Sequence, residues 1–152
     1  MSSSKAASKP PTHDAVLRYV GAAPRSRREV EAYLTRRGVP ATAQAAVLAA
    51  CAARGLIDDT AAARLWAQHW LDQGYAWATV RERLRTKGID DRTLHILDAQ
   101  DRFAGDDESR ARQVAARWRA RPAASVARTL ASRGFDPDLV ERVIRDAFGS
   151  SD

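Results

Sequence analysis

The sequence has few of the features that mark secreted or membrane-spanning proteins. Its 152 residues include one cysteine, Cys51, which excludes an intramolecular disulfide. No apolar run approaches the roughly 20 residues that a membrane-spanning helix needs. The first eleven residues are polar, end in Pro10 and Pro11, and lack the apolar segment of a signal peptide. We therefore expect a cytoplasmic protein without a membrane partner and with a disordered tail over residues 1–11.

Residues for catalysis or cofactor binding are also sparse. The three histidines, His13, His69 and His95, are scattered and do not have the spacing of metal ligands. The acidic run from Asp106 to Glu108 fits a helix start better than a metal site, because carboxylates stabilise the first turn of a helix. Glycine-rich phosphate loops and nucleophile elbows are missing. We expect no enzymatic activity and no cofactor.

Long β-branched or alternating runs are missing too, and much of the apolar content is alanine. Because alanine favours helix and buries little area, this composition predicts an all-α fold with thin cores. The chain has 25 Lys and Arg against 19 Asp and Glu, and only Lys5, Lys9 and Lys87 are lysines. An arginine-rich surface attracts polyanions such as nucleic acid or an acidic protein surface, although a solvated helix face is the alternative.

One template occurs three times along the chain, in residues 29–39, 79–89 and 125–135. Each copy has a valine, a leucine four residues later, then a basic residue, a glycine and a bulky apolar residue. The copies are separated by 50 and 46 residues (Val30, Val80 and Val126). Repeats of this period are typical of stacked helical units.

The template describes a helix and the turn that ends it. Its valine and leucine share one helix face, and its glycine suits the left-handed residue after a helix. A further helix precedes and follows each copy, and Ser26 with Glu29 forms a capping box. We predict three tandem three-helix repeats, with nine short helices that form an elongated, curved rod. The predicted repeats are residues 12–54, 55–104 and 105–149.

The four tryptophans could either pack inside the protein or stack on nucleic-acid bases. Trp66 and Trp70 lie one turn apart, and Trp118 has a related place in the third repeat. We expect these three to pack within or between repeats. Trp77, near the start of a helix, is the better candidate for an exposed ring.

Basic residues gather around the repeated helices. Arg81 and Arg85 share one strip at i,i+4 spacing, which can meet phosphates in a salt-dependent contact. Our candidates for binding such a partner, nucleic acid or an acidic protein surface, are Arg27, Arg28, Arg36, Arg37, Arg81, Arg85, Lys87 and Arg133.

The three copies also carry motifs of a known family. Residues 55–59 (Gly-Leu-Ile-Asp-Asp), Gly74-Tyr75 and residues 80–89 resemble the central signature of RecX regulators. Residues 26–38 resemble the N-terminal motif of that family, and residues 130–140 resemble its C-terminal motif. Two departures are Ala62, where the family usually has a large aromatic residue, and Ala76, where it has glycine.

The resemblance implies a fold of tandem three-helix repeats and a role in DNA repair, homologous recombination and the SOS response. It implies a monomeric, non-enzymatic regulator that binds the RecA recombinase filament on DNA. Such a regulator inhibits the filament's ATP hydrolysis, strand exchange and co-protease activity, and it can also contact single- and double-stranded DNA through phosphates. The alternative is a stand-alone basic helical DNA-binding module, for which naked DNA and filament would bind comparably.

Overall fold

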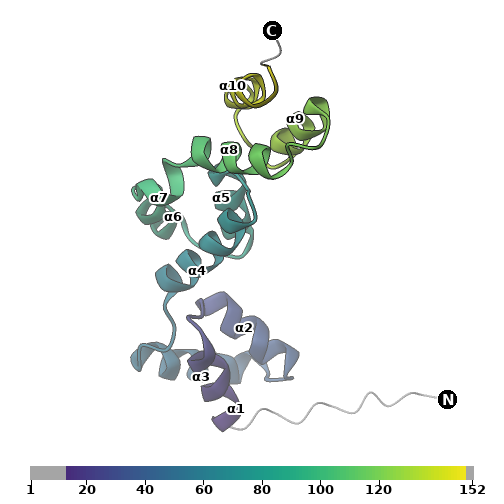
Figure 1. The fold of residues 1–152 in the computed structure, drawn as a ribbon. Helices are drawn as coiled ribbons and strands as arrows, with labels where there is room; N and C mark the ends of the chain where they lie inside the picture. The colour runs from purple at the N-terminus through teal and green to yellow at the C-terminus, as the bar shows by residue number, and fades with distance from the viewer. Residues whose placement is uncertain (1–12, 150–152) are drawn as a thin grey trace, which may run out of the picture. The chain divides into compact units, whose positions relative to one another are not determined.

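A computed structural model of the protein describes residues 13–149, and within this range every regular element is a helix. The predicted tail over residues 1–11 lies outside the described residues. Ten helices are present in the described range, one more than expected, because the four residues of α7 form a short extra helix. The helices are α1 (His13–Ala22), α2 (Arg27–Arg36), α3 (Ala41–Ala53), α4 (Asp59–Asp72), α5 (Trp77–Thr86), α6 (Asp91–Asp98), α7 (Asp101–Ala104), α8 (Asp107–Arg117), α9 (Ala123–Ser132) and α10 (Pro137–Phe148) (Figure 1).

The local signals of the repeated template form as predicted. Ser26 accepts a hydrogen bond from the Glu29 backbone at 3.1 Å, and the Glu29 side chain returns to the Ser26 backbone, which completes the capping box. The three template glycines have φ of 78°, 89° and 89° (Gly38, Gly88 and Gly134). Positive φ is open to glycine because it has no Cβ, so each repeated helix ends where the sequence places its glycine.

The helices follow the repeat in chain order. We call α1–α3 the first triad, α4–α6 the second triad and α8–α10 the third triad. The template valine and leucine of all three copies are fully buried, which makes the middle helix the core of each triad (Val30, Leu34, Val80, Leu84, Val126 and Leu130). The repeat is therefore present in three dimensions, whereas the bounds 12–54, 55–104 and 105–149 stay predictions.

The chain divides into two compact units, residues 1–63 and 64–152. In the first unit, Val16 and Val20 of α1 pack with Val30 and Leu34 of α2, and Leu48 and Cys51 of α3 complete the core. The rings of Tyr19 and Tyr33 stack with centroids 4.0 Å apart at the edge of this core. Cys51 is buried there and packs as a small apolar residue.

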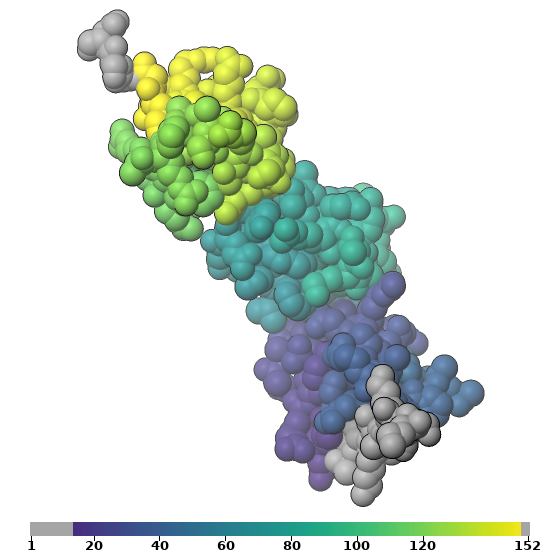
Figure 2. Space-filling model, turned by 90° about the vertical axis from the view of Figure 1, so that its right-hand side faces the viewer, coloured from purple at the N-terminus to yellow at the C-terminus, as the bar shows by residue number. Residues whose placement is uncertain are grey.

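The second unit holds the third triad and the second triad from Arg64 of α4 onward, in direct contact, as Figure 2 shows for the teal residues beside the green and yellow ones. The Ala76 backbone N–H donates to the Arg133 carbonyl at 3.1 Å, and the Thr79 hydroxyl donates to the same oxygen at 3.0 Å. A Cβ on Gly134 would overlap the Thr79 hydroxyl. Gly134 is thus required both by its φ and by this close approach.

Trp77 corrects one expectation. Its ring is 7% exposed and stacks on Phe103, with ring centroids 5.6 Å apart. Its indole N–H donates to Asp98 at 2.8 Å, and its backbone N–H donates to Asp107 at 2.9 Å. A position at the start of a helix is often exposed, but here α7 covers the start of α5 and buries the Trp77 ring.

Within residues 13–149, no helix is long and apolar enough to cross a membrane.

Candidate functional site

The basic residues of α5 form two rows, each with i,i+4 spacing. The first row is Arg81 and Arg85. Arg81 pairs with both carboxylate oxygens of Asp98 at 3.1 Å, and Arg85 lies 3.5 Å from Glu82 and 3.5 Å from Asp91. We call this row the neutralised face of α5, because each guanidinium has a carboxylate partner within the protein.

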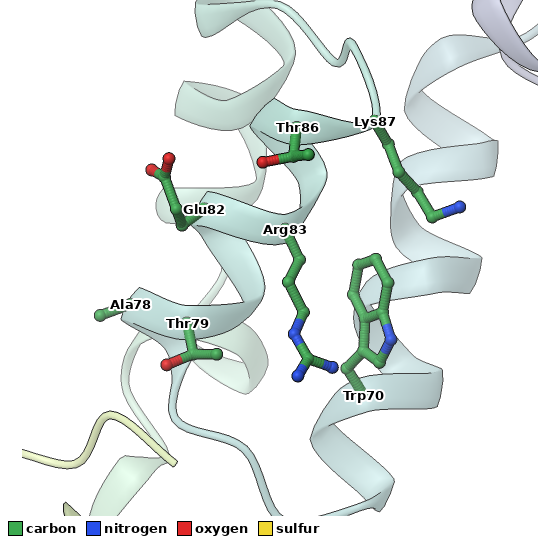
Figure 3. A pocket seen from close by; sticks show the side chains of 7 residues that line it. All are labelled: Trp70, Ala78, Thr79, Glu82, Arg83, Thr86 and Lys87. Atoms are coloured by element: carbon green, nitrogen blue, oxygen red, sulfur yellow. The ribbon is translucent and has the colours of Figure 1, made fainter. Parts of the chain in front are cut away.

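The second row is Arg83 and Lys87, which meet aromatic rings instead of carboxylates. The Arg83 guanidinium carbon lies 4.1 Å from the centre of the Tyr75 ring and 5.6 Å from Trp70. The Lys87 ammonium lies 3.8 Å from the centre of the Trp66 ring. Figure 3 shows Arg83 and Lys87 reaching from α5 toward Trp70 of α4. We call this row the aromatic face of α5.

The aromatic face continues onto the third triad. Arg133, just after α9, lies 5.1 Å from the Tyr75 ring and 4.9 Å from the Trp118 ring. Arg121 lies 4.6 Å from the same Trp118 ring. Together these residues form what we call the cation–aromatic array: Arg83, Lys87, Arg121 and Arg133 with Trp66, Trp70, Tyr75 and Trp118.

The charge of the array is left without acidic compensation. Among residues 13–149, none of its four cations forms an ion pair with a carboxylate, in contrast to Arg81 and Arg85. A cation over an aromatic face is attracted by the ring quadrupole but keeps its full charge. The rings therefore hold the cations in place without neutralising them, which prepares them to meet an anionic ligand at a small cost in side-chain entropy.

A shallow hollow of about 520 Å³ adjoins the array on α5. Its lining comes from Trp70 and from one side of α5, with Arg83 and Lys87 on the aromatic side and Glu82 on the other (Figure 3). Phosphate groups that follow this surface would meet Arg83 and Lys87 in turn. This arrangement suits an extended polyanion better than a small, enclosed ligand.

The candidates in the first unit lie on α2 and at its C-terminal end. Arg27 is exposed and lies 3.3 Å from Glu31, while its backbone N–H donates to Asp59 at 2.8 Å. Arg28 and Arg36 are exposed. Arg37 is exposed as well, and its guanidinium Nε donates to the Tyr33 hydroxyl at 3.4 Å.

The structure thus divides the predicted residues into groups. Lys87 and Arg133 belong to the array, whereas Arg81 and Arg85 lie on the neutralised face. Arg83 and Arg121 of the array were not among the predicted candidates. The i,i+4 pairs Arg83/Lys87 and Trp66/Trp70 were a usable signal, since equal spacing on two helices allows a ladder of contacts.

Two pKa shifts accompany structural contacts. The Thr93 backbone N–H lowers the pKa of Asp90, which caps α6. The hydrogen bonds that Arg112 donates to Glu108 and then to Asp146 raise the pKa of Arg112, which joins α8 to α10. Among the described residues, no three His, Cys, Asp or Glu side chains gather where they could hold a metal ion.

Known proteins resemble the chain along most of its length. A family profile described as the first three-helix domain of RecX matches residues 13–51. The regulatory protein RecX of Stenotrophomonas maltophilia (strain K279a) is 33% identical over 130 residues, which cover 79% of this chain and 77% of that protein. The chain belongs to the RecX family. The regulatory protein RecX of Streptomyces coelicolor is 29% identical over 161 residues, covering 96% of this RecX chain and 86% of its relative.

Solved RecX structures share the fold. A crystal structure of regulatory protein RecX has a TM-score of 0.69 at 22% identity and covers 86% of this chain and 68% of its own. RecX from Lactobacillus salivarius has a TM-score of 0.63 at 21% identity, with coverage of 88% and 92%. At these identities the likeness shows the fold of this RecX chain alone. It confirms the all-α fold of tandem helical repeats that the sequence predicts.

Proposed function

We propose that this chain regulates a RecA-type recombinase by binding the recombinase filament on DNA, without catalysis and without a cofactor. Bound there, it inhibits the filament's ATP hydrolysis, strand exchange and co-protease activity. It acts as a monomer in the cytoplasm. Membership of a family of regulatory proteins supports this role.

The observation that carries the proposal is the cation–aromatic array. A recombinase filament on DNA presents rows of phosphates next to protein. Four cations without carboxylate partners, held over rings on two neighbouring triads, match such a row. Lys87 and Arg133 of the predicted set act there together with Arg83 and Arg121. The neutralised face has a structural role, because Asp98 joins Arg81 and Trp77.

The test is the DNA-dependent ATPase rate of the cognate recombinase, preassembled on single-stranded DNA, as the chain is titrated in. We expect the rate to fall at amounts well below one chain per recombinase protomer, as for a regulator that acts on the filament as a whole. An unchanged rate up to equimolar amounts would overturn the assigned function. A stand-alone DNA-binding module would then become the favoured function, since the same cations can bind the phosphates of naked DNA.

A pair of variants tests the role of the array. Arg83→Gln with Lys87→Gln removes two array cations, and Arg85→Gln with Arg145→Gln removes two exposed arginines that have carboxylate partners. The net charge changes equally in both. We expect the array variant to need at least about tenfold more protein for half inhibition, because each lost phosphate contact weakens binding. Equal inhibition by the two variants would remove the array from the site.

A further inference from the structure

The first triad contains an apolar groove that the function proposed above does not use. It has a volume of about 460 Å³ and lies among the three helices. Leu17 lines it from α1, Leu34 from α2, and Val47 and Ala50 from α3. Arg54 stands among these apolar residues as the one charged group of the lining.

The third triad shows why the groove is open. Val47, Leu97 and Val143 are equivalent because each follows its template valine by 17 residues. Leu97 and Val143 are 0% and 1% exposed, whereas Val47 is only half-buried. In the third triad α8 and α10 pack directly together, and the Arg112–Asp146 ion pair of 2.9 Å joins them. The hollow beside these helices is only about 160 Å³. Two triads built on the same template thus differ in the space between their helices, which is small in the third triad and large in the first.

The cause lies in the side chains of α3. Ala46 and Ala50 line the groove and stand where the third triad has Arg142 and Asp146. Asp146 pairs with Arg112 across the third triad, whereas the short side chain of Ala50 leaves volume unfilled. An open apolar groove of this kind exposes surface that a partner can bury.

The solvent-facing side of α3 has an unusual composition for an exposed helix. Its 13 residues include no charged side chain, and its exposed positions are mostly alanines. A solvated helix face normally carries charged residues, as α10 does with Glu141, Arg142 and Arg145. Exposed alanines allow another helix to approach closely, because their side chains end at Cβ. Groove and alanine face together fit a helix as the occupant.

The charge of the first triad indicates what this helix carries. Both glutamates of α2 already have arginine partners, at 3.7 Å for Glu29 and 3.3 Å for Glu31. Within the described residues, five arginines of this triad form no ion pair with a carboxylate (Arg18, Arg28, Arg36, Arg37 and Arg54). Arg54 brings one of these charges into the groove itself. A ligand with acidic residues beside an apolar stripe complements this surface.

We propose that the groove of the first triad binds an acidic amphipathic helix presented by the recombinase. This inference rests on the function proposed above. The apolar stripe of the bound helix packs on Leu17, Val47 and Leu56, and its carboxylates meet Arg54 and the other unpaired arginines. The first triad then holds the recombinase protein while the array of the second unit meets the DNA phosphates.

The chain offers a matched pair of variants on α3. Ala46 and Ala50 are exposed and line the groove, whereas Ala45 and Ala49 are exposed on the same helix outside the lining. Ala46→Glu with Ala50→Glu places two carboxylates where the acidic helix would lie. Ala45→Glu with Ala49→Glu makes the same change in charge at the same spacing. Because all four positions are exposed, both variants should keep the helix content, which circular dichroism checks.

The measurement is binding to the cognate recombinase without DNA, by interferometry, together with filament ATPase inhibition and binding of a single-stranded oligonucleotide. We expect Ala46→Glu with Ala50→Glu to weaken recombinase binding at least about tenfold, because like charges across an interface are costly. The control stays within about twofold of the parent, and both variants bind the oligonucleotide alike because the added charge is equal. Arg54→Gln should weaken recombinase binding without adding a carboxylate.

The outcomes separate this inference from the proposed function. If the parent inhibits the filament and both glutamate variants bind the recombinase alike, the groove proposal is overturned and the proposed function stands. If the parent neither binds nor inhibits, both fall. Sedimentation that shows a dimer of the parent, dissociated only by Ala46→Glu with Ala50→Glu, would assign the groove to a second copy and overturn the proposal.

Discussion

The two faces of α5 both carry basic residues at the same spacing but have different neighbours. Arg81 and Arg85 meet Asp98, Glu82 and Asp91, whereas Arg83 and Lys87 meet aromatic rings of α4 and the following turn. The positive potential of a guanidinium is largely cancelled by a carboxylate partner, so it attracts an anionic ligand only weakly. The comparison shows that the neighbours of a basic residue on an exposed helix decide whether its charge stays available to a ligand.

The largest expected effect tests whether the neutralised face is structural. Trp77→Ala should lower the free energy of unfolding by about 3–5 kcal/mol, because it empties a buried site against Phe103 and removes a donor to Asp98. Trp66→Ala, in the cation–aromatic array, should cost less than half as much, since its ring is only half-buried. Urea unfolding followed by circular dichroism measures both. Equal losses would contradict the division between the two faces.

The next effect concerns the acids of the neutralised face. Asp98→Ala should cost about 1–3 kcal/mol, because the partly buried Arg81 guanidinium and the Trp77 indole N–H both lose their acceptor. Glu82→Ala should cost below about 0.5 kcal/mol, since its pair with Arg85 is well exposed. Thermal unfolding at fixed pH compares the two. If Glu82→Ala lowered the unfolding free energy as much as Asp98→Ala, the exposure of an ion pair would not predict its contribution to stability.

Salt dependence sharpens the comparison on the binding side. For a single-stranded oligonucleotide, Arg83→Gln with Lys87→Gln should make the slope of log K against log salt shallower by about 1.4, at about 0.7 per lost phosphate contact. Arg85→Gln with Arg145→Gln should leave the slope nearly unchanged. Fluorescence anisotropy at several salt concentrations gives both slopes. Identical slopes for the two variants would show that neither row contacts phosphate selectively.

The smallest effect is a pH dependence at the start of α6, next to the neutralised face. The pKa of Asp90 is lowered by the Thr93 backbone N–H, so its stabilising contribution is present above the ordinary aspartate pKa of about 3.9 and is lost as the pH falls through the lowered pKa. Asn at this position caps without titrating. The stability advantage of the parent over Asp90→Asn should therefore shrink below about pH 4. Melting curves from pH 7 to pH 3 test this, with Asp91→Asn as the control.

Local features of the fold followed from neighbouring residues and could be predicted. The Ser26 capping box, the Asp90 cap and the positive φ of Gly88 and Gly134 depend on residues within one or two turns. The threefold template also predicted the three buried middle helices, since valine and leucine at i,i+4 spacing define one apolar face. The short helix α7 was missed, because its four residues are too few to show a period.

The residues of the cation–aromatic array could be predicted only in part. Lys87 and Arg133 are among the predicted binding residues, and the structure places both in the array. Arg83 is not among the predicted residues, whereas Arg81 and Arg85 are. The spacing of the basic residues on α5 does not by itself distinguish the two rows, because most of their partners lie outside that helix. Asp98 follows Arg81 by 17 residues, and Trp118 precedes Arg133 by 15.

The sequence by itself determined the helices, their ends and their threefold repetition, because these depend on local hydrogen bonds, glycine geometry and a short apolar period. Only the tertiary structure decided which cations are neutralised, that Trp77 is buried, and that the first triad keeps a groove which the third triad closes. Each of these outcomes depends on what a distant segment places beside a side chain. The free energy of a charge or a ring is set by those neighbours and by its exposure to water, not by its own place in the repeat.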